Sequence, residues 1–274
     1  MNKFMASQPH EWPNGAIRRH LCIAADVEKY SHRDIPSQAT AQHDLVGVLE
    51  EATALSGLDR AGWIRQAQGD QELSVLPADV SEAVVLGTFT KHLSDRLGIR
   101  NASRPPRDRM RLRLAIDTGV AALAALGHAG PAPIAVARYL NAPQLRAVLE
   151  KIFAADLAVI VSGRLYEDVV KSRCRGLDPD QYVRAHVRQK EFSDYGWIQV
   201  PGRHPDEVRA VVESLEIIQS VGPGRREVAA EPSSGKYDRS QWVGKGIAIQ
   251  DSVVGRDLNF GVPSVGSDGR SENL

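Results

Sequence analysis

Cysteine is nearly absent from this sequence of 274 residues, which contains only Cys22 and Cys174. Two cysteines can form one bridge at most, so the disulfide framework that supports many small secreted domains is excluded. Such sparse use of cysteine favours a reducing compartment. We therefore expect a cytoplasmic protein.

Long hydrophobic runs and net charge are missing as well. The longest apolar stretches, 120–126 and 157–161, are far shorter than the roughly 20 residues that span a bilayer. The first 15 residues have no apolar segment typical of a secretory signal. The 34 basic residues are balanced by 34 acidic ones, so the whole chain has no field that would draw it to nucleic acid or anionic lipid. We expect no membrane partner and no specific nucleic-acid partner.

The composition that remains is that of a globular protein, with 42% hydrophobic and 25% charged residues. Hydrophobic periodicity and turn residues predict an ordered series of elements. These are a strand at 17–26, a helix at 37–55, a hairpin at 63–76 turning at 68–71, a helix from about 81 to 97 ended by Gly98, a strand at 110–116, a helix at 134–153 broken at Pro143, a strand at 157–162, a helix at 164–172, and two strands within 182–200 turning at 194–196. This order predicts an α+β sandwich, with helices packed on one mixed, largely antiparallel sheet.

The character of the chain changes several times along its length, which predicts six parts. The main domain is expected at 17–202, and Pro, Gly and Ser mark a polar linker after it. The parts are a flexible arm at 1–16, the domain at 17–202, an amphipathic helix at 203–221, a flexible linker at 222–241, a short β motif at 242–262 and a polar disordered tail at 263–274.

Two acids stand out as candidate ligands for a divalent metal. Asp26 ends the first predicted strand, and Asp70 lies at the tip of the predicted hairpin. If the hairpin lies beside the first strand, the two carboxylates converge at one edge of the sheet, and carboxylate oxygen is the ligand that hard divalent ions prefer. Each acid also has an ordinary structural explanation, because Asp26 can cap the next turn and hairpin tips commonly carry Asp.

Five segments in sequence order resemble the catalytic domain of class III adenylate and guanylate cyclases. They are 23–31 (IAADVEKYS), 63–76 (WIRQAQGDQELSVL), 111–121 (RLRLAIDTGVA), 130–143 (GPAPIAVARYLNAP) and 161–170 (VSGRLYEDVV). The resemblance implies a ferredoxin-like, cyclase-type sandwich and a metal pair, Mg²⁺ or Mn²⁺, held by Asp26 and Asp70. It also implies a head-to-tail homodimer, or a hetero-pair with another cyclase-like chain, whose sites form across the interface.

The chain departs from that family's pattern at the residues that select the base and stabilise the transition state. Gln66 stands where the family has a base-selecting Lys, and the position of the helix Asn falls on Ile134 or Ala135. Arg138 is a tentative substitute for the family's catalytic Arg, and Arg65 with Gln66 are tentative nucleotide contacts. The acidic position that reads adenine falls on Ala129, Gly130 or Pro131. A missing oriented donor costs about two or three orders of magnitude in rate, so these departures indicate a degenerate cyclase.

Two further patterns have competing explanations. Five arginines at 104, 107, 109, 111 and 113 could bind phosphate, but no aromatic residue separates them, and we interpret them as a solvated loop that runs into an edge strand. The segment 246–262 (GIAIQDSVVGRDLNFGV) resembles amyloid-type signalling motifs at the ends of bacterial and fungal immune and cell-death proteins. A hairpin docked back on the domain explains the same pattern.

The sequence therefore predicts a signalling or adaptor protein. Its cyclase-like domain would bind nucleotide and divalent metal and would dimerise, with little or no enzymatic turnover. Residues 244–262 would mediate self-assembly or partner binding. The alternatives are an active nucleotidyl cyclase that forms a 3′,5′-cyclic nucleotide from ATP or GTP by two-metal catalysis, and a purely structural dimer module, which has no use for either aspartate.

Overall fold

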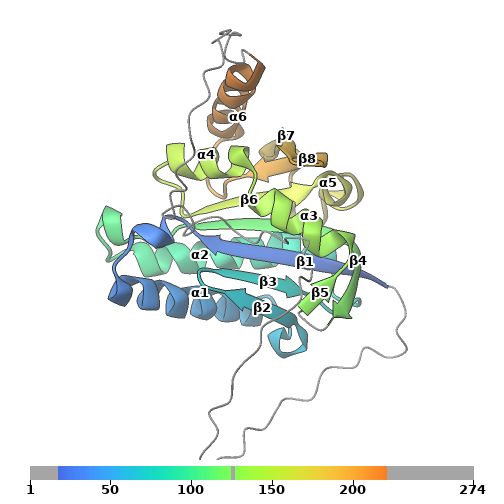
Figure 1. Cartoon of the computed structure of the whole chain (residues 1–274), viewed down its shortest axis with the longest axis horizontal. Helices are drawn as coiled ribbons and strands as arrows, with labels where there is room; N and C mark the ends of the chain where they lie inside the picture. The colour runs from blue at the N-terminus through green and yellow to red at the C-terminus, as the bar shows by residue number, and fades with distance from the viewer. Residues whose placement is uncertain (1–17, 125–126, 221–274) are drawn as a thin grey trace, which may run out of the picture. The chain divides into compact units, whose positions relative to one another are not determined.

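One mixed sheet organises the protein, whose computed structural model describes residues 18–124 and 127–220 (Figure 1). The strand order is β2-β3-β1-β4-β6-β8-β7, with β5 paired to β4. The β4–β6 pair is parallel and every other pairing is antiparallel. The strands are β1 (Arg18–Val27), β2 (Ile64–Gln68), β3 (Gln71–Val75), β4 (Leu112–Ala124), β5 (Gly127–Ala129), β6 (Leu157–Ser162), β7 (Val183–Gln189) and β8 (Phe192–Gln199). The predicted α+β architecture with a largely antiparallel sheet is confirmed.

Helices cover both faces of this sheet. Two long helices pack on one face, and two shorter ones meeting at a corner pack on the other. The α-helices are α1 (Ile35–Leu55), α2 (Thr90–Asn101), α3 (Pro131–Leu140), α4 (Pro143–Lys151), α5 (Gly163–Asp168) and α6 (Pro205–Ser220). The break predicted at Pro143 is the α3–α4 corner, because proline cannot continue a helix but is well suited to begin one.

Strand β1 separates the two halves of the core, since successive side chains of a strand point to opposite faces. Leu21, Ile23 and Ala25 pack beneath α1 and α2, whereas Cys22 and Ala24 pack beneath α3. Asp26 continues the second series, so its carboxylate belongs to the α3 face of the sheet. This alternation decides which residues share a face with the candidate metal ligand.

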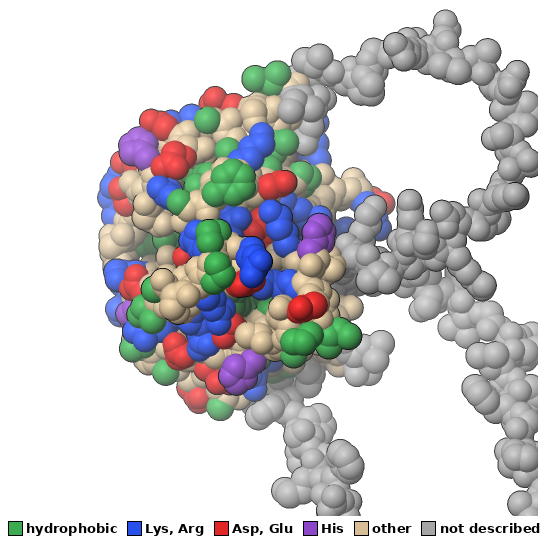
Figure 2. All heavy atoms as spheres, turned by 90° about the vertical axis from the view of Figure 1, so that its left-hand side faces the viewer, with side chains coloured by type: hydrophobic (Ala, Val, Ile, Leu, Met, Phe, Trp, Pro, Cys, Tyr) green, Lys and Arg blue, Asp and Glu red, His purple; other side chains and the backbone are tan. Residues whose placement is uncertain are grey.

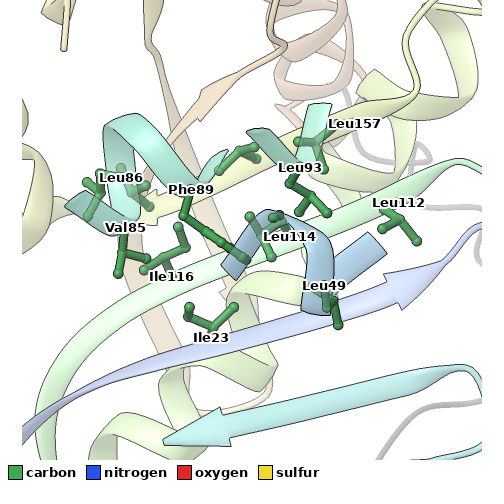
Figure 3. Packing of buried hydrophobic residues seen from close by; sticks show 14 of the residues in the cluster. Ile23, Leu49, Val85, Leu86, Phe89, Leu93, Leu112, Leu114, Ile116 and Leu157 are labelled. Atoms are coloured by element: carbon green, nitrogen blue, oxygen red, sulfur yellow. The ribbon is translucent and has the colours of Figure 1, made fainter. Parts of the chain in front are cut away.

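The α1–α2 face holds a closely packed apolar cluster around Phe89 (Figure 3). Phe89 is fully buried and meets Trp63 edge-on, with ring centroids 6.0 Å apart. It ends a π-helical segment, Val84–Phe89, which leads directly into α2. Gly98 was expected to stop this helix, but α2 continues to Asn101, where the side-chain amide exchanges two 2.8 Å hydrogen bonds with the backbone of Met110. These long-range bonds hold the helix end in place, which local sequence does not indicate.

The predicted end of the strand at 110–116 and the predicted turn at 194–196 are both wrong, because long-range packing decides where these strands end. Strand β4 continues beyond residue 116 to Ala124 because β1 pairs with it as far as Ala121 and β5 pairs with its last three residues. The β7–β8 turn lies at 190–191, with Lys190 in the left-handed region at φ 52°, and not at 194–196. Gly196 is instead inside β8, where a Cβ atom would approach Ile160 Cδ1 to 2.6 Å. The glycine there permits close packing and does not make a turn.

The arginine-rich segment also differs from its interpretation. Strand β4 lies between β1 and β6, so the arginines run into a central strand and not an edge strand. Each arginine lies beside an acid. The pairs are Arg104–Asp44, Arg107–Asp108, Arg109–Asp156, Arg111–Glu28 and Arg113–Asp26. Most of this basic run is thereby neutralised within the fold.

Helix α6 lies within the helix expected at 203–221. Its Val208, Val211 and Val212 join the apolar cluster beneath α3 and α4, so the core continues across the boundary expected near 202. The predicted arm at 1–16, linker at 222–241, β motif at 242–262 and tail at 263–274 lie outside the described residues. Within the described ranges, no helix combines the length and apolar character that crossing a membrane requires.

The apolar cluster yields a stability prediction. Replacing Phe89 by Ala should lower the free energy of unfolding by about 3–5 kcal/mol, because it removes a fully buried ring and leaves a cavity. The control is Ile99→Ala in α2, whose side chain is exposed and should change stability by no more than about 0.5 kcal/mol. Urea unfolding followed by circular dichroism measures both; equal effects would contradict the packing described here.

Candidate functional site

The end of β1 and the tip of the β2–β3 hairpin bring Asp26 and Asp70 together. Asp26 pairs with Gln71 in the β1–β3 register, and the Val27 amide donates to the Asp70 carbonyl at 3.1 Å. Burial raises the pKa of Asp70, and the negative charge of Asp26 raises it further. The convergence expected from the order of strand and hairpin is therefore present in the folded chain.

Asp26 already has partners for both of its carboxylate oxygens. Gln71 Nε2 donates to Oδ1 at 2.7 Å, and the guanidinium of Arg113 donates to Oδ2. Arg113 lies directly across from Asp26 in the β1–β4 register, and Asp26 is only 2% exposed. The Arg113 guanidinium is thus the positive charge that neutralises the Asp26 carboxylate in this structure.

This arrangement does not fit an open site for Mg²⁺ or Mn²⁺. Such ions are held by several oxygen ligands, and Asp26 would have to exchange its partners to supply one. Among residues 18–124 and 127–220, no group of three or more His, Cys, Asp or Glu side chains is placed to hold a metal. Metal binding by Asp26 and Asp70 remains a prediction.

Arg146 on α4 is a second arginine near the Asp26–Arg113 pair. Arg146 Nη2 donates to Asn141 Oδ1 at 2.5 Å, and Asn141 Nδ2 donates to the Ala137 carbonyl at 3.0 Å. Burial and the positive charge of Arg113 lower the pKa of Arg146, whereas the charge of Asp26 opposes that change. Arg146 therefore lies on the α4 side of the Asp26–Arg113 pair.

The sequence offered Arg113 only as one of five arginines that could bind phosphate, and it gave no place beside Asp26 to Arg113, Asn141 or Arg146. A signal existed for Arg113, because aligning strand 110–116 antiparallel to strand 17–26 can bring it opposite Asp26. No comparable signal existed for Arg146, whose position depends on the angle between α3 and α4. Figure 2 views the end of the molecule where β1 ends and β4 begins, and it shows Lys and Arg side chains interspersed with Asp and Glu.

The tentative nucleotide contacts Arg65 and Gln66 are separated by the fold. Gln66 pairs with Leu73 in the β2–β3 register and faces the α3 side of the sheet. Arg65, the residue before it in the strand, points to the opposite side. Gly127, at φ +118°, lies against Gln66, since a Cβ there would come within 2.5 Å of Gln66 Oε1. The residue over Gln66 is thus a glycine, which has no side chain to contact a base.

The helix positions taken from the resemblance lie on α3. The place of the family's Asn falls on Ile134 or Ala135, and both are apolar; Ile134 is 44% exposed. Arg138 lies one turn further along, and its carbonyl accepts a 3.1 Å hydrogen bond from Gln189 Nε2. This bond joins the backbone at Arg138 to β7.

A separate polar group is buried further along the α3 face. Asp117 is 7% exposed, and burial raises its pKa, while a hydrogen bond from the Ser162 side chain opposes the rise. Cys22 pairs with Asp117 in the register, and burial together with that acid raises the pKa of the thiol to about 12. Cys22 is therefore an unreactive core thiol.

No protein-family model and no curated protein sequence matches the chain. Among solved structures, the chain is similar to an adenylate/guanylate cyclase/hydrolase from Silicibacter pomeroyi, at 18% identity and a TM-score of 0.48, over 69% of this chain and 99% of that one. It is also similar to the guanylyl cyclase Cya2, at 13% identity and a TM-score of 0.48, over 69% and 95%. A bacterial light-regulated adenylyl cyclase has 11% identity and a TM-score of 0.47, over 72% and 99%.

The Asp26–Arg113 pair should be strongly coupled energetically. Asp26→Asn should lower the free energy of unfolding by about 3–5 kcal/mol, because it leaves a largely buried guanidinium without its counter-charge. Adding Arg113→Gln should cost much less than it does alone, which a double-mutant cycle by urea unfolding measures. The exposed pair Lys91–Asp95 is the control, with an expected coupling of about 0.3–0.5 kcal/mol. Simple additivity at Asp26 and Arg113 would refute the coupling.

Asp117 should make stability depend on pH. Because its pKa is raised in the folded state from 3.8, the unfolded state loses this proton first, and stability falls as pH rises from about 3.8 through the folded pKa. Asp117→Asn removes that penalty. The difference in unfolding free energy between variant and wild type should increase over this window and then level off, whereas a difference independent of pH would contradict the assignment.

Proposed function

We propose that the described residues form a class III cyclase-like domain that binds a nucleotide and acts in signalling or as an adaptor, with little or no turnover. The observation that carries this proposal is the convergence of Asp26 and Asp70 beside Arg113, at the edge where β1 and the β2–β3 hairpin end. A purely structural module would have no need for two neighbouring carboxylates and a guanidinium at one sheet end.

Weak turnover is supported by three features of the same face. Asp26 is engaged by Gln71 and Arg113, so it is not free to assist a reacting group. Gly127 lies over Gln66, and Ile134 presents an apolar side chain where an oriented donor is expected. Each missing donor costs about 10²–10³ in rate, and these losses combine.

The second candidate is an active nucleotidyl cyclase that makes a 3′,5′-cyclic nucleotide from ATP or GTP. The observation that favours it is the proximity of the two carboxylates, since Asp26 is near enough to raise the pKa of Asp70. A homodimer, or a hetero-pair with another cyclase-like chain, would supply the residues this chain lacks, Arg138 of one chain being the tentative catalytic contribution. Self-assembly through residues 244–262 is a further part of the proposal that lies outside the described residues.

Nucleotide binding and turnover are separable by experiment. Calorimetry with ATP and GTP, with and without Mg²⁺ or Mn²⁺, should detect binding, while chromatography after prolonged incubation should detect little or no cyclic nucleotide or pyrophosphate. Substantial cyclic product that disappears in Asp70→Ala, and persists in a control variant of exposed Glu213 (Glu213→Gln), would establish the active cyclase instead. No binding heat under any condition would overturn the proposed function.

A further inference from the structure

The polar residues at the end of β1 form an ordered row across the sheet. Gln71 on β3, Asp26 on β1 and Arg113 on β4 are consecutive partners in the strand registers. Asp70 adjoins this row from the hairpin, and Arg146 adjoins it from α4. Asp70 therefore belongs to the β3 side of the Asp26–Arg113 pair, whereas Arg146 belongs to a helix.

Arg113 has donor groups that the fold leaves unused. Its guanidinium bonds Asp26 through Nη2, whereas Nε and Nη1 are buried and have no hydrogen-bond partner among the described residues. Buried donors without a partner are uncommon in folded proteins, and such a group indicates a bound water, ion or ligand. The unused donors of an arginine match an anion, and phosphate oxygens suit its planar fork.

Arg146 is the second positively charged side chain near Asp26, after Arg113, and it is accessible from solvent. Asn141 fixes its direction, because the Asn141 amide is itself held by the Ala137 carbonyl at the end of α3. Arg146 is exposed although its guanidinium is close enough to feel the charges of Arg113 and Asp26. Helix α4 packs on the side of the sheet that carries Arg113, because the Leu149 carbonyl in α4 accepts a hydrogen bond from Arg111, which lies two residues before Arg113 in the chain and shares its face. A ligand can therefore reach Arg146 from solvent, on the helix that covers Arg113.

We propose that Arg146 and Arg113 form a subsite that binds the phosphate groups of a nucleotide without a divalent metal. The guanidinium of Arg113 neutralises Asp26 in the way that a metal would, and its free donors together with Arg146 contact the phosphates. This inference rests on the proposed function and assigns to Arg146, on α4, the phosphate contact that the resemblance assigned to Arg138.

The test is calorimetric titration of the full chain in EDTA with ATP, GTP and sodium tripolyphosphate. Wild type should bind in EDTA, and Arg146→Gln should weaken binding by about tenfold or more, as expected for loss of a charge-assisted contact. Lys151→Gln, also exposed on α4, removes the same charge and should leave affinity unchanged. Thermal unfolding of each variant verifies folding; Arg113 is left unchanged because its replacement would leave buried Asp26 unpaired.

The outcomes separate the two proposals. Binding that needs Mg²⁺ and is unaffected by Arg146→Gln would overturn this inference and leave the proposed function standing. Absence of nucleotide binding with and without metal would overturn both. Equal affinity for tripolyphosphate and ATP would assign the subsite to phosphate alone, whereas tighter binding of ATP would show that the nucleoside also contributes.

Discussion

The ion pair between Asp26 and Arg113 constrains how the two central strands β1 and β4 pair with each other. Both side chains lie at the end of neighbouring strands β1 and β4 and are largely withdrawn from water. A buried charge is stable only when its partner stays in place. A shift of either strand by one residue would separate the two side chains, and each charge would then lack the partner that offsets its removal from water. The register of the sheet and the chemistry of its end are therefore determined together.

The same requirement explains how an arginine-rich chain without net charge folds. Arg60 and Glu72 form two hydrogen bonds on the α1 side, and Arg111 reaches Glu28 while its other donors bind carbonyls after α4, those of Ile152 and Ala155 among them. The planar guanidinium can satisfy several acceptors at once, which an ammonium group does less well. Arginine thus connects strand ends to helix ends in this fold.

The two faces of the sheet differ in the polar residues that they carry. The α1–α2 face is filled by a large apolar cluster around Phe89, whereas the α3 face carries Asp26, Asp117 and Gln66 beside an apolar cluster of its own. Apolar packing on both faces holds the strands in register, and the α3 face also presents polar groups at the sheet end. The α3–α4 corner then adds Arg146 to that end, where the carboxylate is already neutralised by Arg113.

The sequence by itself determined the strands and helices whose periodicity is strong, the hairpin that carries Asp70, and the break at Pro143, because these depend on local preferences and on which face of an element is buried. It misplaced the β7–β8 turn, since a glycine that permits close packing at Ile160 looks the same in sequence as one that makes a turn. Only the tertiary structure decided that β4 is central, that Arg113 faces Asp26 and that Arg146 joins them. Strand order and the angle between helices are set by packing between residues far apart in the chain, and no local pattern records them.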